Sequence, residues 1–345
     1  MSNRCISIAE VSDLLFTAWQ RIVAKDSARK IADAIIRTAL QKDERISPIE
    51  DAVEDLKKAL RIQSKWIEVA RKGAVRSYDL CGMPGITFMP DLTEKAVVLA
   101  KEYGVGIVSI KNSGGVDALS PWLLDIPSHD CIGLFAWNGG SYTTVPFGST
   151  EPFFGTNPIA YAIPTSDEPL LLDMSTSEIP FMDLMQAIQK GVSLPERAGL
   201  DELGRVTTDA SRVYDIDTDS DVKLLPMGGS YKGSAIMLLV EIITGAFIDS
   251  KMAREATSST QIPEEFGGVL VAIDIATFTS PSLFKVRVTN MIRQIRLSQP
   301  APGFANVRVP GDKSYEREQN RLHSGTICLE ETLVAELRQL AHQQK

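Results

Sequence analysis

The chain changes character near residue 81, and the part that follows most constrains its fold. From there on, short runs of β-branched and aromatic residues alternate with segments whose apolar residues recur at helical spacing. The expected strands are GIVSI (106–110), IGLFAW (132–137), IAYAI (159–163), LLLDM (170–174) and GVLVAIDI (268–275). The expected helices cover residues 91–104, 180–191 and 234–248. Such alternation is typical of a mixed α/β layer structure.

The two ends of the chain have a helical pattern instead. A helix is expected after Ser27, which can cap it, and a second begins at Ser47, where Pro48 and Glu50 complete a capping box. The tail from residue 326 to 343 is also expected to be helical. The expected domains are a small helical one formed by residues 1–75 plus 290–345, and an α/β one formed by residues 76–289.

Composition narrows the class of protein. With 345 residues, of which 44% are hydrophobic, the chain is long enough to bury the cores of two domains. Its net charge of −8 argues against a large nucleic-acid surface. The sequence opens without an apolar leader, and its most apolar stretch, residues 234–248, is short and interrupted by Glu241. We therefore expect that stretch to be a buried core helix, and we expect no membrane partner.

The cysteines and the acidic residues give no metal signature. Cys5, Cys81, Cys131 and Cys328 form no CxxC pair, so we expect reduced thiols in a cytoplasmic protein, without a disulfide framework or a zinc site. The acidic run at residues 215–221 resembles the start of a calcium loop but lacks its central glycine and closing glutamate. It is therefore expected to be a solvated loop, and no metal is predicted.

Three glycine-rich turns are candidate phosphate sites. They are IKNSGGVDAL (110–119), LLPMGGSYKG (224–233), which places Lys232 in the first turn of a helix, and VRVPGDK (307–313). Free backbone N–H groups at a helix start, together with the helix dipole, favour anions. The sequence contains neither GxGxxG nor GxxxxGK[ST], so neither the Rossmann fingerprint nor the P-loop applies. Each turn also fits the simpler interpretation of a turn that begins a helix.

A cluster of hydroxyls ends the strand at residues 170–174. Ser175, Thr176 and Ser177 can receive a polar ligand, or they can satisfy backbone groups, since Ser177 is a competent cap for the next helix. Asp183, in the first turn of that helix, has the same two interpretations, because the helix dipole alone favours an acid there.

Five segments, in order along the chain, resemble the malate/L-lactate dehydrogenase-like family of NAD(P)H-dependent oxidoreductases. They are FGTNPIAYAIP (154–164), LLLDMSTS (170–177), LDELGRVTTD (200–209), LLPMGGSYKGSAIMLLVE (224–241) and VPGDKSYEREQNRLHSGTICL (309–329). This family is unrelated to the Rossmann-type lactate dehydrogenases. The resemblance implies a mixed-sheet, non-Rossmann NAD(P)-binding domain beside a small helical domain formed from both chain ends. It also implies NADPH or NADH as cofactor, a small-molecule substrate and a homodimer.

The resemblance also suggests roles for individual residues. Asp183 stands ten residues after Asp173, where many members carry lysine, which resembles the Δ1-piperideine-2-carboxylate/Δ1-pyrroline-2-carboxylate reductases. In those enzymes the matching aspartate belongs to a catalytic relay, and the threonine matching Thr156 contacts the substrate. The expected cofactor-binding residues are Gly115, Val116, Asp117, Ala118, Leu119, Asp173, Met174, Ser175, Thr176, Lys232, Val309, Pro310 and Gly311.

The N-terminal motif of the family departs most from this sequence. The family has Ser-His-Gly followed three residues later by arginine, and the matching segment here is DERISPIEDA (43–52). Ser47 keeps the serine and stays a catalytic candidate, but Pro48 replaces the histidine and Ala52 replaces the arginine. The three histidines of the chain, His129, His323 and His342, fall on no motif.

The missing histidine bears on the reaction. Reduction of a ketone leaves an alkoxide that needs a proton from a positioned acid, whereas an iminium brings its own proton. We therefore expect reduction of the C=N bond of a cyclic imino acid, with Asp183 acting on the substrate. Two alternatives remain: a 2-hydroxy-acid dehydrogenase with a substituted proton donor, for which Asp183, Tyr231 and Lys232 are candidates, and a catalytically weak relative that binds a nucleotide.

Overall fold

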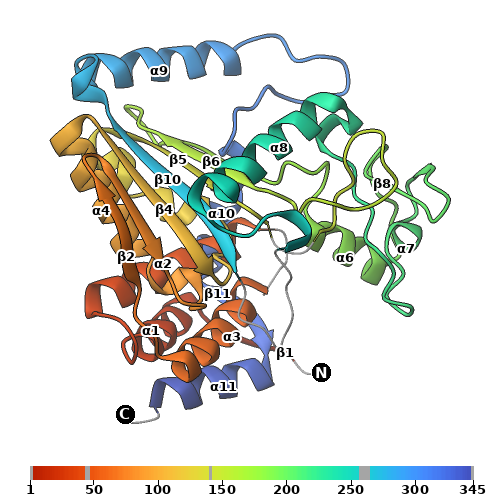
Figure 1. The fold of residues 1–345 in the computed structure, drawn as a ribbon, viewed down its shortest axis with the longest axis horizontal. Helices are drawn as coiled ribbons and strands as arrows, with labels where there is room; N and C mark the ends of the chain where they lie inside the picture. The colour runs from red at the N-terminus through yellow and green to blue at the C-terminus, as the bar shows by residue number, and fades with distance from the viewer. Residues whose placement is uncertain (1–2, 43–46, 140–141, 256–264, 343–345) are drawn as a thin grey trace.

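A mixed seven-stranded sheet forms the centre of the molecule (Figure 1). The structure is a computed structural model, which describes residues 3–42, 47–139, 142–255 and 265–342. In sheet order the strands are β2 (Ile67–Lys72), β3 (Val75–Asp79), β4 (Val105–Ser113), β10 (Phe266–Asp274), β5 (Cys131–Trp137), β6 (Ile159–Ile163) and β7 (Leu170–Met174). Strands β3 and β4 run parallel, and every other neighbouring pair is antiparallel. The predicted mixed α/β fold is confirmed.

Helix α4 (Met89–Tyr103) covers one part of this sheet by packing against β4 and β10. Its buried residues recur at helical spacing, and it ends where Gly104 adopts a left-handed φ of 84°. Gly106, two residues later in β4, lies against the helix so closely that a Cβ there would collide with the carbonyl oxygen of Ala96. Glycine at this position therefore lets the helix approach the strand.

The helices of the two chain ends pack on one another, as predicted, and several of them lie at one end of the molecule (Figure 1). They are α1 (Ile8–Trp19), α2 (Lys25–Gln41), α3 (Ser47–Ile62), α10 (Asp312–Ser324) and α11 (Glu331–His342). Helix α1 packs on α2 and α11, and α10 packs on α2. One continuous apolar core joins these helices to the sheet, so the domain limits at residues 75 and 290 stay a prediction.

A separate lobe lies beyond strand β7. It contains α6 (Phe181–Lys190), β8 (Gly199–Leu200), β9 (Val206–Thr207) and α7 (Ala210–Val213) around a small apolar cluster of its own. Helices α5 (Ser120–Leu123), α8 (Tyr231–Thr244) and α9 (Pro281–Arg296) complete the α-helices of the described residues. Short 3-10 turns connect them: η1 (Gly85–Thr87), η2 (Ile126–His129), η3 (Met227–Gly229), η4 (Ala246–Ile248), η5 (Ala253–Glu255) and η6 (Ile275–Thr277).

The chain ends differ from their sequence-based expectation in two respects. Residues Thr326–Glu330 form strand β11, not helix, and this strand pairs antiparallel with β1 (Asn3–Ser7). Each strand finds its partner at the other end of the chain, which local periodicity cannot indicate. Helix α2 begins at Lys25, and Ser27 lies inside it, where its Oγ donates to Asp91 Oδ1 at 2.8 Å.

The cysteines overturn a second expectation. Cys5 and Cys328 face each other in the β1–β11 register and form a disulfide, although we expected only reduced thiols. Antiparallel pairing brought their Cβ atoms within bonding reach despite a sequence separation of 323 residues. Cys81 and Cys131 are not disulfide-bonded, as expected.

Helix α8 is only half buried, so the prediction of a buried core helix is wrong for one of its faces. Gly233, Met237, Val240 and Glu241 face the protein, whereas Leu238, Leu239 and Ile242 are exposed. By length and composition alone, the 18 residues from Tyr231 to Ile248 could cross a membrane, with a mean hydropathy of 1.5. A core helix of a soluble protein passes the same test, so this is weak evidence for a membrane.

Candidate active site

Five segments from distant parts of the chain meet around a cavity of about 540 Å³, called the cleft below. They are the C-terminal end of α2, the loop before α5, the end of β7, the first turns of α6 and the first turns of α10. The lining residues are Thr38, Gln41, Lys42, Asp117, Ala118, Ser120, Asp173, Met174, Ser175, Pro180, Met182, Asp183, Gln186, Lys313, Ser314 and Arg317. Six of the predicted site residues, Asp117, Ala118, Asp173, Met174, Ser175 and Asp183, are therefore brought together here.

Asp173 organises the floor of the cleft. Its Oδ2 accepts hydrogen bonds from the backbone N–H groups of Leu119 and Ser120, both at 2.9 Å, and so ties the 115–119 loop to the end of β7. The protein around the carboxyl raises the pKa of Asp173, an effect that the N–H groups of Ser120 and Leu119 oppose. The side chain is nevertheless exposed within the open cleft. Asp173 thus positions the loop and faces the cavity at once.

Two residues of the cleft lining, Lys42 and Asp117, form an ion pair, and a third charged residue outside the lining, Asp51, interacts with both. Lys42 Nζ lies 3.4 Å from Asp117 Oδ1, and Asp117 has a left-handed φ of 55°, a conformation uncommon outside glycine. Asp51 of helix α3 interacts electrostatically with both groups. Desolvation raises the pKa of Asp51 to about 6, and the negative charge of Asp117 acts in the same direction, whereas the positive charge of Lys42 opposes the shift. Sequence reasoning missed Asp51 and Lys42, which carry no motif.

The hydroxyl cluster divides between the two interpretations left open by the sequence. Thr176 is fully buried, and its Oγ1 donates to the carbonyl oxygen of Asn157 at 2.8 Å, while Ser177 Oγ donates to that of Ile179 at 2.8 Å. Ser175 lines the cleft, with its Oγ 3.3 Å from the carbonyl oxygen of Ser177. Buried backbone groups therefore use two of the hydroxyls, and the third faces the cavity.

Hydrogen bonds of its neighbour Asn157 and of its own backbone hold the turn that carries Thr156. Asn157 is fully buried, and its Nδ2 donates to Glu241 Oε2 at 2.6 Å. Burial raises the pKa of Glu241, opposed by the hydrogen bonds from Asn157 and from the Ala253 backbone. The Thr156 carbonyl oxygen accepts the N–H of Thr176 at 2.9 Å, which joins this turn to the end of β7. Thr156 is half-buried and is not among the lining residues, although its hydrogen-bond partner Thr176 directly follows the lining residue Ser175.

Helix α10 supplies a basic wall directly after the VRVPGDK turn (307–313) that was predicted as a candidate phosphate site, although its lining residues were not predicted individually. Gly311 precedes it with a left-handed φ of 93°, and Lys313, Ser314 and Arg317 then face the cleft from its first turns. Arg317 Nη1 also donates to the carbonyl oxygen of Gln41 at 3.3 Å. The available signal was a glycine followed by basic and hydroxyl residues in a first helical turn, which is typical of an anion site.

Other predicted residues lie outside the cleft lining. Lys232 is exposed in the first turn of α8. Gly115, Val116 and Leu119 belong to the loop whose Asp117 and Ala118 line the cleft, and Val309, Pro310 and Gly311 lead into α10. Ser47 is the first residue of α3, and its side chain lies outside the described residues. The three histidines are exposed in η2, α10 and α11, away from the cleft lining.

The residues of the cleft fit a dinucleotide with two phosphates. Lys42, Lys313 and Arg317 provide positive charge, and the N-terminus of α10 provides oriented N–H groups with the helix dipole behind them. The cavity volume falls within the roughly 300–1,000 Å³ typical of small-molecule sites. Among the described residues, no group of three or more His, Cys, Asp and Glu side chains is placed to hold a metal ion.

Comparison with known proteins agrees with this fold. The sequence model of the malate/L-lactate dehydrogenase family matches residues 6–338, so the chain belongs to that family and is an oxidoreductase. The chain is 30% identical to the malate dehydrogenase of Pyrococcus horikoshii over 252 residues, 71% of this chain and 68% of that protein. It is 28% identical to the Δ1-pyrroline-2-carboxylate/Δ1-piperideine-2-carboxylate reductase of Pseudomonas putida, over 70% of this chain and 67% of that one.

A solved structure shows the same fold. The malate dehydrogenase of Entamoeba histolytica superposes with a TM-score of 0.85 at 21% identity, covering 99% of this chain and 98% of that one. Dehydrogenases of the family use NAD(H) or NADP(H). The solved structure thus shows the shared fold, and the family match supports oxidoreductase chemistry. The relatives are named for several different substrates.

Proposed function

We propose that this enzyme reduces the C=N bond of a small cyclic imino acid with NADPH or NADH. The observation that carries the proposal is the chemistry of the cleft: Asp173 and Asp183 face it, while all three histidines lie elsewhere. Carboxylates favour a cationic iminium over a neutral ketone, and an iminium needs no proton from the protein. The Pseudomonas putida relative, named for reducing two such imino acids, adds support.

Each wall of the cleft has a part in this proposal. A bound nicotinamide dinucleotide supplies the hydride. Lys313, Ser314 and Arg317 hold its phosphates at the N-terminus of α10, and the Asp173-anchored loop of residues 115–119 fixes the opposite wall. Asp183 stabilises the positive charge of the iminium before reduction. Thr156, whose backbone is hydrogen-bonded to Thr176 just after β7, contacts the substrate. The amine product leaves without a change in the protein's protonation.

A 2-hydroxy-acid dehydrogenase is the second candidate, and Asp51 favours it. A carboxyl with a pKa of about 6, next to the ion pair of Lys42 and Asp117, is partly protonated at neutral pH and can donate a proton to an alkoxide. The Pyrococcus horikoshii relative, named as a malate dehydrogenase, belongs with this candidate.

A substrate panel distinguishes the candidates. Consumption of NADH and NADPH is followed by absorbance against Δ1-piperideine-2-carboxylate, Δ1-pyrroline-2-carboxylate, pyruvate and oxaloacetate. We expect turnover of the cyclic imines. Turnover of the 2-oxo acids alone would sink the first proposal and select the second. Dinucleotide binding without turnover of any substrate would identify the weakly catalytic relative.

We also propose that the chain is a cytoplasmic homodimer. Large apolar side chains are exposed on α8 and α9, among them Leu239, Val286 and Met291, and Figure 1 shows α9 at the end of the molecule opposite to the terminal helices. Exposed apolar patches of this kind are typical of subunit interfaces. The molar mass in solution, measured by light scattering at micromolar concentration, checks this proposal. A monomer would contradict it.

A further inference from the structure

The disulfide lies in a small ribbon that joins the two ends of the chain. We call β1, β11 and the Cys5–Cys328 bond the terminal ribbon. Five residue pairs form its antiparallel register, and Cys5 stands directly opposite Cys328. Both cysteines are exposed, so small thiols and protein dithiols can reach the bond. A two-stranded ribbon is marginally stable by itself in water, so this one is held by the covalent bond together with its packing on α1 and α11 through the buried Ile6 and Leu329.

The terminal ribbon adjoins the C-terminal end of α10, the helix whose first turns form the basic wall of the cleft. Helix α10 ends at Ser324, and after Gly325 the chain enters β11. The other strand leads into α1 through Ser7, whose Oγ accepts the N–H of Glu10 at 3.1 Å, and Ile8 N–H donates to the carbonyl oxygen of Gly325. Because only Gly325 separates α10 from β11, local opening of the terminal ribbon would disturb the C-terminal end of α10 directly.

Helix α10 in turn holds the end of α2. Arg321 Nη1 donates to the carbonyl oxygens of Ala39 and Lys42, at 2.7 and 2.6 Å, which satisfies C-terminal carbonyls of α2. Gln41 Nε2 donates to Glu318 Oε2 at 2.8 Å in the same contact. The residues of α2 that line the cleft, Thr38, Gln41 and Lys42, thus depend on α10, and α10 is anchored by the terminal ribbon.

We propose that the Cys5–Cys328 bond is a reversible redox control of nucleotide binding, in which the disulfide form binds the dinucleotide more tightly than the dithiol form. Only the identity of the ligand rests on the proposed function. The disulfide form holds α10 and the end of α2 in the geometry of the cleft. The dithiol form keeps the fold but lets the terminal ribbon open locally, so binding has to restore that order.

The chemistry is thiol–disulfide exchange with a dithiol reductant. One thiolate of the reductant attacks a sulfur of the bond to give a mixed disulfide, and its second thiol then releases the protein. Two electrons and two protons pass to Cys5 and Cys328, which become thiols, and the reductant becomes a disulfide. In a cytoplasmic protein, disulfides are usually transient and redox-sensing, which agrees with the exposure of this bond.

The test uses the full chain in two states, oxidised and treated with a dithiol. Alkylation under denaturing conditions followed by mass measurement verifies each state, with two modifiable cysteines, Cys81 and Cys131, in the first state and all four in the second. Fluorescence titration gives the Kd for NADH and NADPH, and hydrogen–deuterium exchange follows residues 312–330. We expect reduction to weaken binding of the preferred dinucleotide by about fivefold. We also expect it to speed exchange in α10 and β11.

Variants separate this effect from a general response to the reductant. Replacing Cys5→Ser and Cys328→Ser together should fix the weak-binding state with or without reductant, and Cys81→Ser should leave the redox response intact. Equal Kd and equal exchange in two verified states would overturn the proposal, as would four modifiable cysteines in protein kept under oxidising conditions. If neither dinucleotide binds either state, the proposed function fails, while unequal exchange in residues 312–330 still supports the redox control of the ribbon.

Discussion

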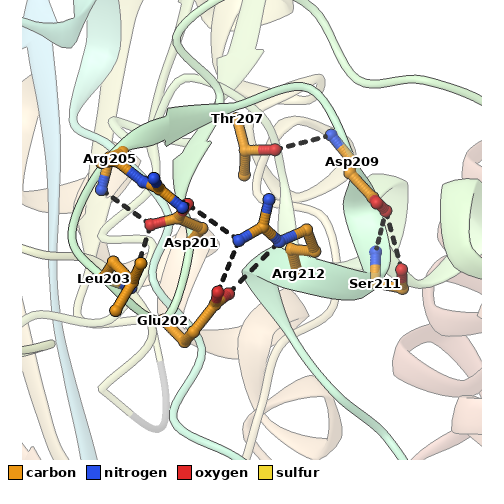
Figure 2. Close-up of polar contacts among 8 residues, drawn as sticks. All are labelled: Asp201, Glu202, Leu203, Arg205, Thr207, Asp209, Ser211 and Arg212. Atoms are coloured by element: carbon orange, nitrogen blue, oxygen red, sulfur yellow. Dashed lines mark hydrogen bonds and ion pairs between the residues drawn. The ribbon is translucent and has the colours of Figure 1, made fainter.

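Two regions of this molecule gather acidic and basic side chains, and they use them differently. In the hairpin of β8 and β9, Asp201 is almost completely buried. It accepts hydrogen bonds from the backbone N–H groups of Leu203 and Arg205, at 3.0 and 2.8 Å, and from the guanidinium groups of Arg205 and Arg212 (Figure 2). Arg212 continues the network to Glu202. The negative charge of Asp201 is thus compensated by groups of the hairpin and by Arg212 of α7.

The cleft holds a similar number of charges, but its charged side chains border an open cavity. Asp117, Asp173 and Asp183 line it together with Lys42, Lys313 and Arg317. Both regions contain segments that resemble the family, LDELGRVTTD in the hairpin and LLLDMSTS at the cleft. The comparison teaches that the polar groups of one family motif can be satisfied within the fold, while those of another face space for a ligand.

Asp183→Asn should give the largest effect and should act on the reaction. We expect kcat for the imine to fall about 100-fold, with a smaller change in cofactor Kd, because the amide removes a charge placed at the developing reaction centre. Steady-state kinetics and dinucleotide titration measure the two quantities.

The matched control is Asp167→Asn, which removes a carboxylate paired with Arg293 on the exposed surface. It should leave kcat unchanged. If Asp183→Asn also left kcat unchanged and lowered only the melting temperature, the cleft would resemble the hairpin, and Asp183 would be a helix-start acid.

Lys313→Ala should have the next largest effect, on cofactor affinity. Loss of a charge-assisted hydrogen bond to a phosphate predicts a Kd about tenfold higher, and the difference should shrink at high salt. Titration at two ionic strengths checks both statements. Lys72→Ala is the control, since Lys72 is exposed on β2, at the edge of the sheet opposite to β7. Equal losses for the two variants would mean that general charge, and not the α10 wall, attracts the nucleotide.

Asp201→Ala should affect stability and spare the reaction. The hydrogen bonds from Arg205, first from its backbone, hold the pKa of Asp201 below its usual range, so this stabilising contribution is present at neutral pH and is lost on acidification. We expect the melting temperature at pH 7 to fall by about 3 to 6 °C and kcat to stay unchanged. Glu202→Ala, at an exposed position of the same network, should shift it far less. A large loss of kcat in folded Asp201→Ala protein would contradict a purely structural hairpin.

The fold shows which sequence signals were sufficient. Strands β4, β5, β6, β7 and β10 follow buried or alternating apolar runs, which periodicity detects. The β2–β3 hairpin was missed because β2 is exposed along its whole length, so no apolar pattern marks it. The terminal ribbon was missed because each of its strands is five residues long and finds its partner at the far end of the chain.

The residues in and around the cleft also divide into those that the sequence indicated and those that only the structure revealed. Asp173 and Asp183 could be predicted because they belong to segments that resemble the family. Lys42 reaches the cleft only through the packing of α2, and Arg317 only through α10, more than 270 residues away from α2. Asp51 of α3 interacts electrostatically with Lys42 and Asp117 without lining the cleft. The sequence holds no local record of such contacts, so these residues needed the structure.

Asp51→Asn should have the smallest effect, and its pH dependence makes it informative. Surrounding protein and the negative charge of Asp117 raise the pKa of Asp51 from 3.8 to about 6, so the folded state resists ionisation of this carboxyl. The stability that the neutral carboxyl contributes is complete below about pH 4 and is lost as the pH rises through about 6. The neutral asparagine avoids this loss, so the variant should match the parent near pH 4 and exceed it near pH 7. Because the side chain retains access to solvent, the gain should stay below about 1 kcal/mol.

Chemical denaturation at both pH values measures the gain from Asp51→Asn, with Glu54→Gln, an exposed acid on the same helix, as the control. Equal stabilisation at both pH values would contradict a raised pKa.

The same variant also tests the two candidate reactions. If the enzyme reduces an iminium, kcat/KM should keep its pH profile in Asp51→Asn. If Asp51 instead protonates an alkoxide, the limb near pH 6 should vanish and 2-oxo-acid turnover should fall with it, by a factor on the order of 10². The cleft would then use a carboxyl of α3 where the family uses a histidine.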